Sequence, residues 1–231
     1  MIVDTSVSLQ HLVIAIDGPA ASGKSSVARS LARRLGFVYV NTGAMYRAVT
    51  WHALESGVPT DDVAKVAELV QSSEIHCGVL DCESTIAING VDPAPHLVSE
   101  GVNANVSRIA AVPEVRRRLV ALQREYAKCQ DIVMEGRDIG SAVFPETRYK
   151  FYIDASPEVR AQRRMKQGLQ DSIQSRDKLD SSRRMSPLII AEDAHVIDSS
   201  NLTVDGVVGE IVGRLKMYGL QIEEGRSHVK R

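Results

Sequence analysis

The hydrophobic positions of this chain alternate between two periods. Short runs rich in β-branched residues are typical of strands that are buried on both faces. Such runs lie at residues 12–17, 37–40, 131–134, 149–153 and 195–197. Between them, apolar residues recur at the spacing of a helix with one buried face. These helical segments lie at residues 25–35, 43–55, 61–70, 96–111, 113–129, 157–166, 171–184 and 204–218. The alternation predicts an α/β fold, with a parallel sheet flanked by helices on both faces.

One segment departs from this alternation. Residues 74–80 and 84–90 have the two-residue period of strands and follow each other closely. We expect them to form a short antiparallel hairpin that closes on Asn89 and Gly90, because an Asn-Gly pair favours a tight turn. The hairpin indicates a small insertion into the α/β framework.

The first predicted strand runs into a glycine-rich loop. This phosphate loop consists of Gly18, Pro19, Ala20, Ala21, Ser22, Gly23, Lys24 and Ser25, and Ser26 follows it in the next predicted helix. The spacing G-x-x-x-x-G-K-[ST] predicts backbone N–H groups that surround a phosphate chain at a helix N-terminus. Lys24 would meet the β- and γ-phosphates, and the Ser25 hydroxyl would reach Mg²⁺. A glycine-rich surface turn is the alternative, but it leaves Lys24 without a role.

The composition fits a single globular α/β domain. The chain has 231 residues, of which 44% are hydrophobic and 25% are charged, and its formal net charge is -1. This balance gives no general attraction to nucleic acid or membrane, so we expect neither as a partner. The three cysteines lack the paired spacing of a zinc site. Reduced thiols, and a start without a basic leader, favour a cytoplasmic protein.

Two polar groups directly follow predicted strands. Thr42 and Arg47 come after the second strand, at the end where parallel sheets bind ligands. The alternative for Thr42 is a helix N-cap, which is compatible with such a role. Arg137 and Asp138 lie between glycines after the third strand. Because buried charges need partners, this pair favours a binding site over a surface turn in which the two side chains pair with each other.

Further basic residues lie on predicted helices. Arg176, Asp180 and Arg183 have the spacing of one helix face, where two guanidinium groups beside a carboxylate could hold a phosphate and sugar hydroxyls. A solvated charged face is the alternative. Ser107 and Arg116 flank the corner between two predicted helices. Several converging arginines favour a transferase over a nucleotide switch, which binds only one nucleotide.

Together these motifs resemble the bacterial cytidylate kinase family, whose members are P-loop nucleoside monophosphate kinases. The resemblance covers residues 12–219. The segments that carry it are residues 16–26, 42–47, 136–140, 143–145, 154–156, 176–177 and 186–188, with Asp180 and Arg183. The phosphate loop is shared by many NTPases, whereas the segments at 42–47 and 136–140 are far more specific.

The resemblance implies a role for each candidate residue. The residues implied to recognise the cytosine ring are Ser107, Arg116 and Asp138. Those implied to hold the sugar are Thr42, Arg176 and Asp180. Those implied to bind the monophosphate are Arg47, Arg137 and Arg183, which with Lys24 form the implied catalytic set. Residues 18–26 would bind ATP, with Ser25 on the metal.

The resemblance also implies one domain over residues 10–220, followed by a frayed tail at 221–231. Its core would comprise residues 10–56, 100–169 and 185–220, with a region that binds the nucleoside monophosphate (NMP) at 57–99 and a lid at 170–184. The chain departs from the family pattern at Thr42, where serine is common, and at Glu135, where aspartate is common. The insert at 57–99 is also short.

The activity implied by the resemblance is transfer of the γ-phosphoryl group of ATP to CMP or dCMP, with Mg²⁺ as cofactor. We expect a cytoplasmic monomer. One alternative is a kinase for UMP, AMP or another metabolite on the same framework. The other is a regulatory nucleotide switch, which would hydrolyse ATP or GTP slowly.

Overall fold

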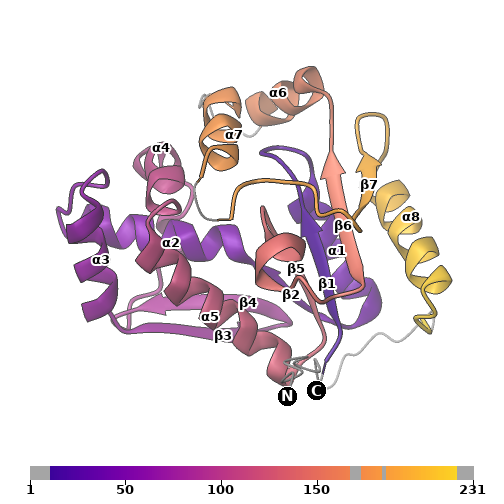
Figure 1. Ribbon diagram of the computed structural model, residues 1–231, viewed down its shortest axis with the longest axis horizontal. Helices are drawn as coiled ribbons and strands as arrows, with labels where there is room; N and C mark the ends of the chain where they lie inside the picture. Colours follow the sequence, from indigo (N-terminus) through magenta and orange to yellow (C-terminus); the bar gives the residue numbers. More distant parts are fainter. Residues whose placement is uncertain (1–10, 167–172, 184–185, 223–231) are drawn as a thin grey trace, which may run out of the picture.

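A seven-stranded sheet forms the centre of the protein in the computed structural model, which describes residues 11–166, 173–183 and 186–222 (Figure 1). The strands are β1 (Val13–Asp17), β2 (Val38–Asn41), β3 (Ile75–Leu80), β4 (Glu83–Ile88), β5 (Ile132–Gly136), β6 (Tyr149–Asp154) and β7 (His195–Asp198). Their order is β3-β4-β2-β5-β1-β6-β7, and the described strands pair in parallel except β3, which is antiparallel to β4. The predicted α/β class is confirmed.

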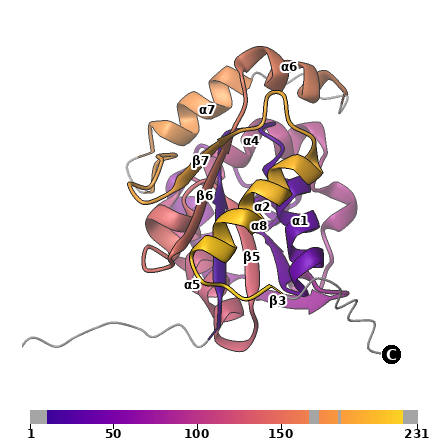
Figure 2. The same cartoon turned by 90° about the vertical axis from the view of Figure 1, so that its right-hand side faces the viewer.

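Helices cover both faces of the sheet (Figure 2). They are α1 (Lys24–Leu35), α2 (Thr42–Glu55), α3 (Val63–Ser72), α4 (Glu100–Ile109), α5 (Pro113–Cys129), α6 (Pro157–Lys166), α7 (Ile173–Ser181) and α8 (Val204–Met217), with a 3₁₀-helix η1 (Ala94–His96) and a π-helix η2 (Ile139–Val143). Helices α1 and α8 pack against Ile14 and Ile16 of β1, while α5 packs in the cluster of Val13 and Ala15. Successive residues of a strand point to opposite faces, so every residue of β1 is buried.

The hairpin turn lies at a different place from the one predicted. Strands β3 and β4 pair antiparallel with Leu80 opposite Glu83, so the turn is made by Asp81 and Cys82. Both have a positive φ, 51° and 61°, as a two-residue hairpin turn of this hand requires. The prediction that the hairpin closes on the Asn-Gly pair was therefore wrong. That pair turns the chain after β4, and β4 itself joins the main sheet beside β2.

Two kinds of feature are absent from the described residues. Among the described residues, no helix is both long and apolar enough to cross a lipid bilayer. Within the same part of the chain, no three His, Cys, Asp or Glu side chains gather as ligands for a metal ion. Cys77, Cys82 and Cys129 are free thiols.

Candidate active site

The strand order brings three of the predicted groups together. Strands β2, β5 and β1 are neighbours and parallel, so their carboxyl ends lie side by side at one edge of the sheet. The phosphate loop follows β1, Thr42 follows β2, and Arg137 and Asp138 follow β5. A cavity of about 870 Å³ opens at this edge. The arrangement is that of a ligand site in an open parallel sheet.

Two glycines allow the phosphate loop to adopt its shape. A Cβ on Gly18 would lie 2.1 Å from the carbonyl oxygen of Ile153, so the loop can approach β6 this closely only without a side chain. Gly23 has a φ of 91° and begins α1 as its N-cap. Lys24 is buried and its Nζ donates to the Pro19 carbonyl at 3.0 Å, whereas Ser25 and Ser26 are exposed. The loop therefore places a lysine and two exposed serines at a helix N-terminus.

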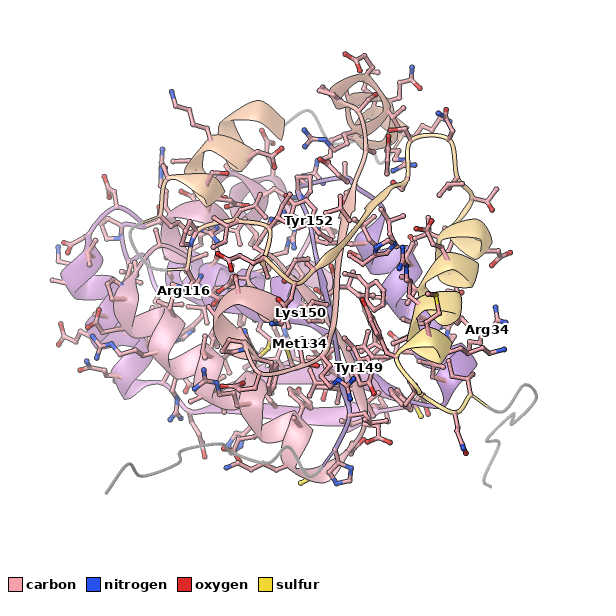
Figure 3. The ribbon with its side chains drawn as sticks, turned by 45° about the vertical axis from the view of Figure 1, so that its right-hand side comes forward. Arg34, Arg116, Met134, Tyr149, Lys150 and Tyr152 are labelled. Carbon is pink, nitrogen blue, oxygen red and sulfur yellow. The ribbon has the colours of Figure 1, made fainter. Side chains whose placement is uncertain are left out.

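Asp138 pairs with Arg116 and not with its neighbour Arg137. Arg116 lies on α5 (Figure 3). Its guanidinium is 2% exposed and donates to Asp138 Oδ2. It also donates to the Ala110 carbonyl at 3.2 Å and lies 5.5 Å from the centre of the Tyr46 ring. Burial raises the pKa of Asp138, and the adjacent Arg116 charge opposes that effect. The self-paired surface turn considered for residues 137 and 138 is thus wrong.

Asp180 of α7 connects three elements through its carboxylate. It accepts from Ser107 Oγ at 3.0 Å and from Arg137 Nε at 2.9 Å, and it pairs with Arg183. Burial alone would raise the pKa of Asp180, but the Arg137 and Arg183 charges outweigh it and lower the pKa. Asp180 is only 2% exposed, so a solvated helix face does not describe it. Arg183 lies beyond the end of α7.

Thr42 is not the N-cap of its helix. Asn41 caps α2, because its side chain accepts from the Ala44 N–H at 3.0 Å. Thr42 is the first helical residue, and its hydroxyl donates to the Glu135 carbonyl at 2.8 Å. One turn later, Arg47 folds back toward Gly43, where an added Cβ would lie 3.1 Å from its guanidinium.

Sequence reasoning missed two arginines of α6 and the residues around them. Arg163 donates to the Ser22 carbonyl at 3.0 Å and to the Ser199 carbonyl at 2.8 Å. It therefore connects the phosphate loop to the segment after β7. Arg160 pairs with Asp177 of α7, whose Oδ1 accepts from the Ala20 N–H at 3.1 Å. Two arginines at helical spacing, after a strand that ends near a phosphate loop, are the signal that could have found them.

The same reasoning passed over Asp17. It closes β1 and is buried, although a charge at the end of an otherwise apolar strand is unusual. Its two oxygens accept backbone N–H groups from the segment after Asp138.

Most of the predicted site residues line one cavity. They are Ala20, Ala21, Ser22, Gly23, Lys24, Ser25, Ser26, Thr42, Arg47, Ser107, Arg137, Asp138, Asp180 and Arg183. Gly18, Pro19 and Arg116 are not part of the lining and support residues that are. Arg176 belongs to α7, but its side chain lies outside the described residues, as do residues 170–172 and 184 of the predicted lid.

Comparison with known proteins identifies the family. A family model described as cytidylate kinase matches residues 14–217. The chain belongs to the cytidylate kinase family. The cytidylate kinase of Oceanobacillus iheyensis is 37% identical over 227 residues, covering 94% of this chain and 99% of that protein. The cytidylate kinase of Nocardia farcinica is 43% identical over 212 residues, covering 87% and 91%. That of Clostridium botulinum strain Langeland is 41% identical over 217 residues, covering 89% and 98%.

Proposed function

We propose that this member of the cytidylate kinase family transfers the γ-phosphoryl group of ATP to the 5′-phosphate of CMP or dCMP. The observation that carries the proposal is the buried pair of Arg116 and Asp138. It stands beside a cavity that extends from the phosphate loop to Arg137 and Asp180. A nucleotide switch binds only one nucleotide, so it does not require a second, charged half of the site.

ATP binds with its phosphates on the phosphate loop. The backbone N–H groups and the α1 N-terminus attract the anion, and Lys24 neutralises the β- and γ-phosphates. Arg163, held between Ser22 and Ser199, keeps the loop in shape.

The residues present fit Mg²⁺ as the cofactor. The exposed Ser25 hydroxyl at the start of α1 is the protein group that would hold the ion. Phosphate oxygens and water would complete its coordination, which would suit a small, strongly hydrated cation. When bound, the ion neutralises phosphate charge.

CMP occupies the other half of the cavity. Arg47, Arg137 and Arg183 bind its phosphate, while Thr42, Arg176 and Asp180 hold the sugar. Transfer needs no covalent intermediate, because the acceptor is already an anion and the transition state is loose. Catalysis is therefore positioning and charge neutralisation.

Arg116, Asp138 and Ser107 distinguish cytosine from uracil. Cytosine presents an amino donor beside an N3 acceptor, and uracil presents the reverse. An ionised Asp138 only accepts and Arg116 only donates, so uracil would leave buried polar groups unpaired. We also propose that the enzyme is a cytoplasmic monomer, and its free thiols support the assignment to a reducing compartment.

Replacing Asp138 tests this assignment. In Asp138→Ala the kcat/KM for CMP should fall far more than that for UMP, narrowing their ratio by about tenfold or more. Initial rates with both acceptors measure it, and Asp131→Asn, at the opposite end of the sheet, serves as control. An equal loss for both acceptors would remove Asp138 from base recognition.

A further inference from the structure

Asp17 holds the backbone that carries two of the proposed acceptor-binding residues. It is the last residue of β1, and its side chain is buried under the edge of the site. Oδ1 accepts from the Ile139 N–H and Oδ2 from the Gly140 N–H, both at 2.8 Å. These N–H groups open the π-helix η2, directly after Arg137 and Asp138.

The same residues are tied to the phosphate loop by a second contact. Arg137 Nη1 donates at 3.0 Å to the carbonyl of Gly18, which follows Asp17 in the chain. The segment of Arg137 and Asp138 is thus fixed at both sides to the residues where β1 becomes the phosphate loop. A shift of either segment relative to the other would break the hydrogen bonds that Asp17 and Arg137 make between them.

A carboxylate is a costly way to satisfy two N–H groups in this place. Burial raises the pKa of Asp17 to about 7; the Asp138 charge adds to this effect and Lys24 opposes it. The two backbone hydrogen bonds from Gly140 and Ile139 lower the pKa and offset part of the cost of burial. The group that does offer two acceptors at once, with each oxygen aimed at a different N–H, is a carboxylate.

We propose that Asp17 is a positioning residue that sets the acceptor site in register with the phosphate loop. Asp17 is not among the residues that line the cavity, so it acts through the backbone that it holds. By fixing η2, it sets the direction of the Asp138 side chain toward the base and of the Arg137 side chain toward the phosphate of CMP. The inference rests on the proposed function, because it assumes that CMP binds these two residues.

The test compares Asp17→Asn with Asp131→Asn. An asparagine would place an NH₂ group against one of the two N–H groups, leaving a buried donor unpaired. Asp131 is the matched control, because it also accepts a backbone N–H next to β1, from Leu12 at 2.8 Å, but at the far end of the strand. Calorimetry measures binding of CMP, of UMP and, separately, of a non-hydrolysable ATP analogue.

In Asp17→Asn the CMP affinity should fall by about tenfold or more. The affinity for the ATP analogue should stay near that of the wild type, and the preference for CMP over UMP should narrow. A variant that matches Asp131→Asn in all three measurements would overturn the inference alone. A wild-type protein that does not phosphorylate CMP would overturn the proposed function and the inference together.

A measurement on the wild type covers the case in which Asp17→Asn does not fold. Hydrogen exchange of the Ile139 and Gly140 amides should be slow in the nucleotide-free protein and change little when CMP binds. Fast exchange that slows only with CMP would show that Asp17 does not hold the segment, and would overturn the inference.

Discussion

At the scale of single residues, the site is built from charges that are buried against one another. Asp138 and Asp180 each lie against at least one guanidinium group, and each is almost fully buried. Burying an ion is costly unless it is paired, and removing one partner leaves the other uncompensated. Such pairs are therefore weak evidence for stability, and we interpret them as parts of a functional site.

Lys24 gives the clearest prediction at this scale. Lys24→Ala should lower kcat by about 100-fold or more, because it removes a charge aimed at the transferred phosphoryl group. CMP binding should stay near that of the wild type, since Lys24 belongs to the ATP half of the site. Initial-rate assays of ADP formation measure kcat, and calorimetry measures CMP binding.

Lys128→Ala is the control, because Lys128 is exposed and pairs only locally with Glu125 among the contacts described. Activity of Lys24→Ala within a few-fold of that control would remove Lys24 from the catalytic set.

At the scale of elements, the chain segments around the site can pack this closely only where a glycine has no side chain. A Cβ on Gly136, at the end of β5, would lie 2.7 Å from both Thr42 Oγ1 and Ile139 Cδ1. The carboxyl ends of β2 and β5 can therefore meet η2 only because this residue is a glycine.

Gly136→Ala should destabilise the protein by about 1–3 kcal/mol, because the added methyl group overpacks this junction. Gly213→Ala is the matched control: Gly213 lies inside α8 with no atom within 4 Å of its built Cβ. That variant should gain about 0.5–1 kcal/mol, as alanine favours a helix over glycine. Urea unfolding measures both, and equal effects of the same sign would contradict the packing argument.

Helix α7 belongs to the predicted lid, and we expect it to close over bound nucleotides. Its Asp177 and Asp180 contact the phosphate loop and Arg137, so both halves of the site meet at this helix. Hydrogen exchange in α7 should slow when CMP and an ATP analogue bind together, while α8 changes little. Exchange that is already slow in the free protein, and unchanged by both ligands, would count against a lid.

At the scale of the whole molecule, much of the fold could be predicted from local signals. Pro113 is typical of a first helical turn, and the helix predicted at 113–129 has the bounds of α5. The phosphate loop and the strands around it follow from spacing and period. The hairpin turn was misplaced because Asn89 and Gly90 are stronger turn formers than Asp81 and Cys82, while cross-strand pairing decided the register.

The pairing of distant charges could not be predicted in the same way. Arg137 pairs with Asp180, which lies 43 residues later, and Asp17 binds N–H groups more than a hundred residues away. Such partners are set by the strand order and by helix packing, which no local pattern encodes. Motif spacing and strand ends supplied the candidate site residues, and the roles that the resemblance implies for them stay predictions.

The most direct test of the central claim is a panel of phosphate acceptors with the wild-type protein and Mg-ATP. ADP formation should require an added acceptor, and CMP and dCMP should lead UMP, AMP and GMP clearly in kcat/KM. A different acceptor in the lead would contradict the assignment of the base site. ADP formation at the same rate without any acceptor would contradict the kinase itself and favour a nucleotide switch.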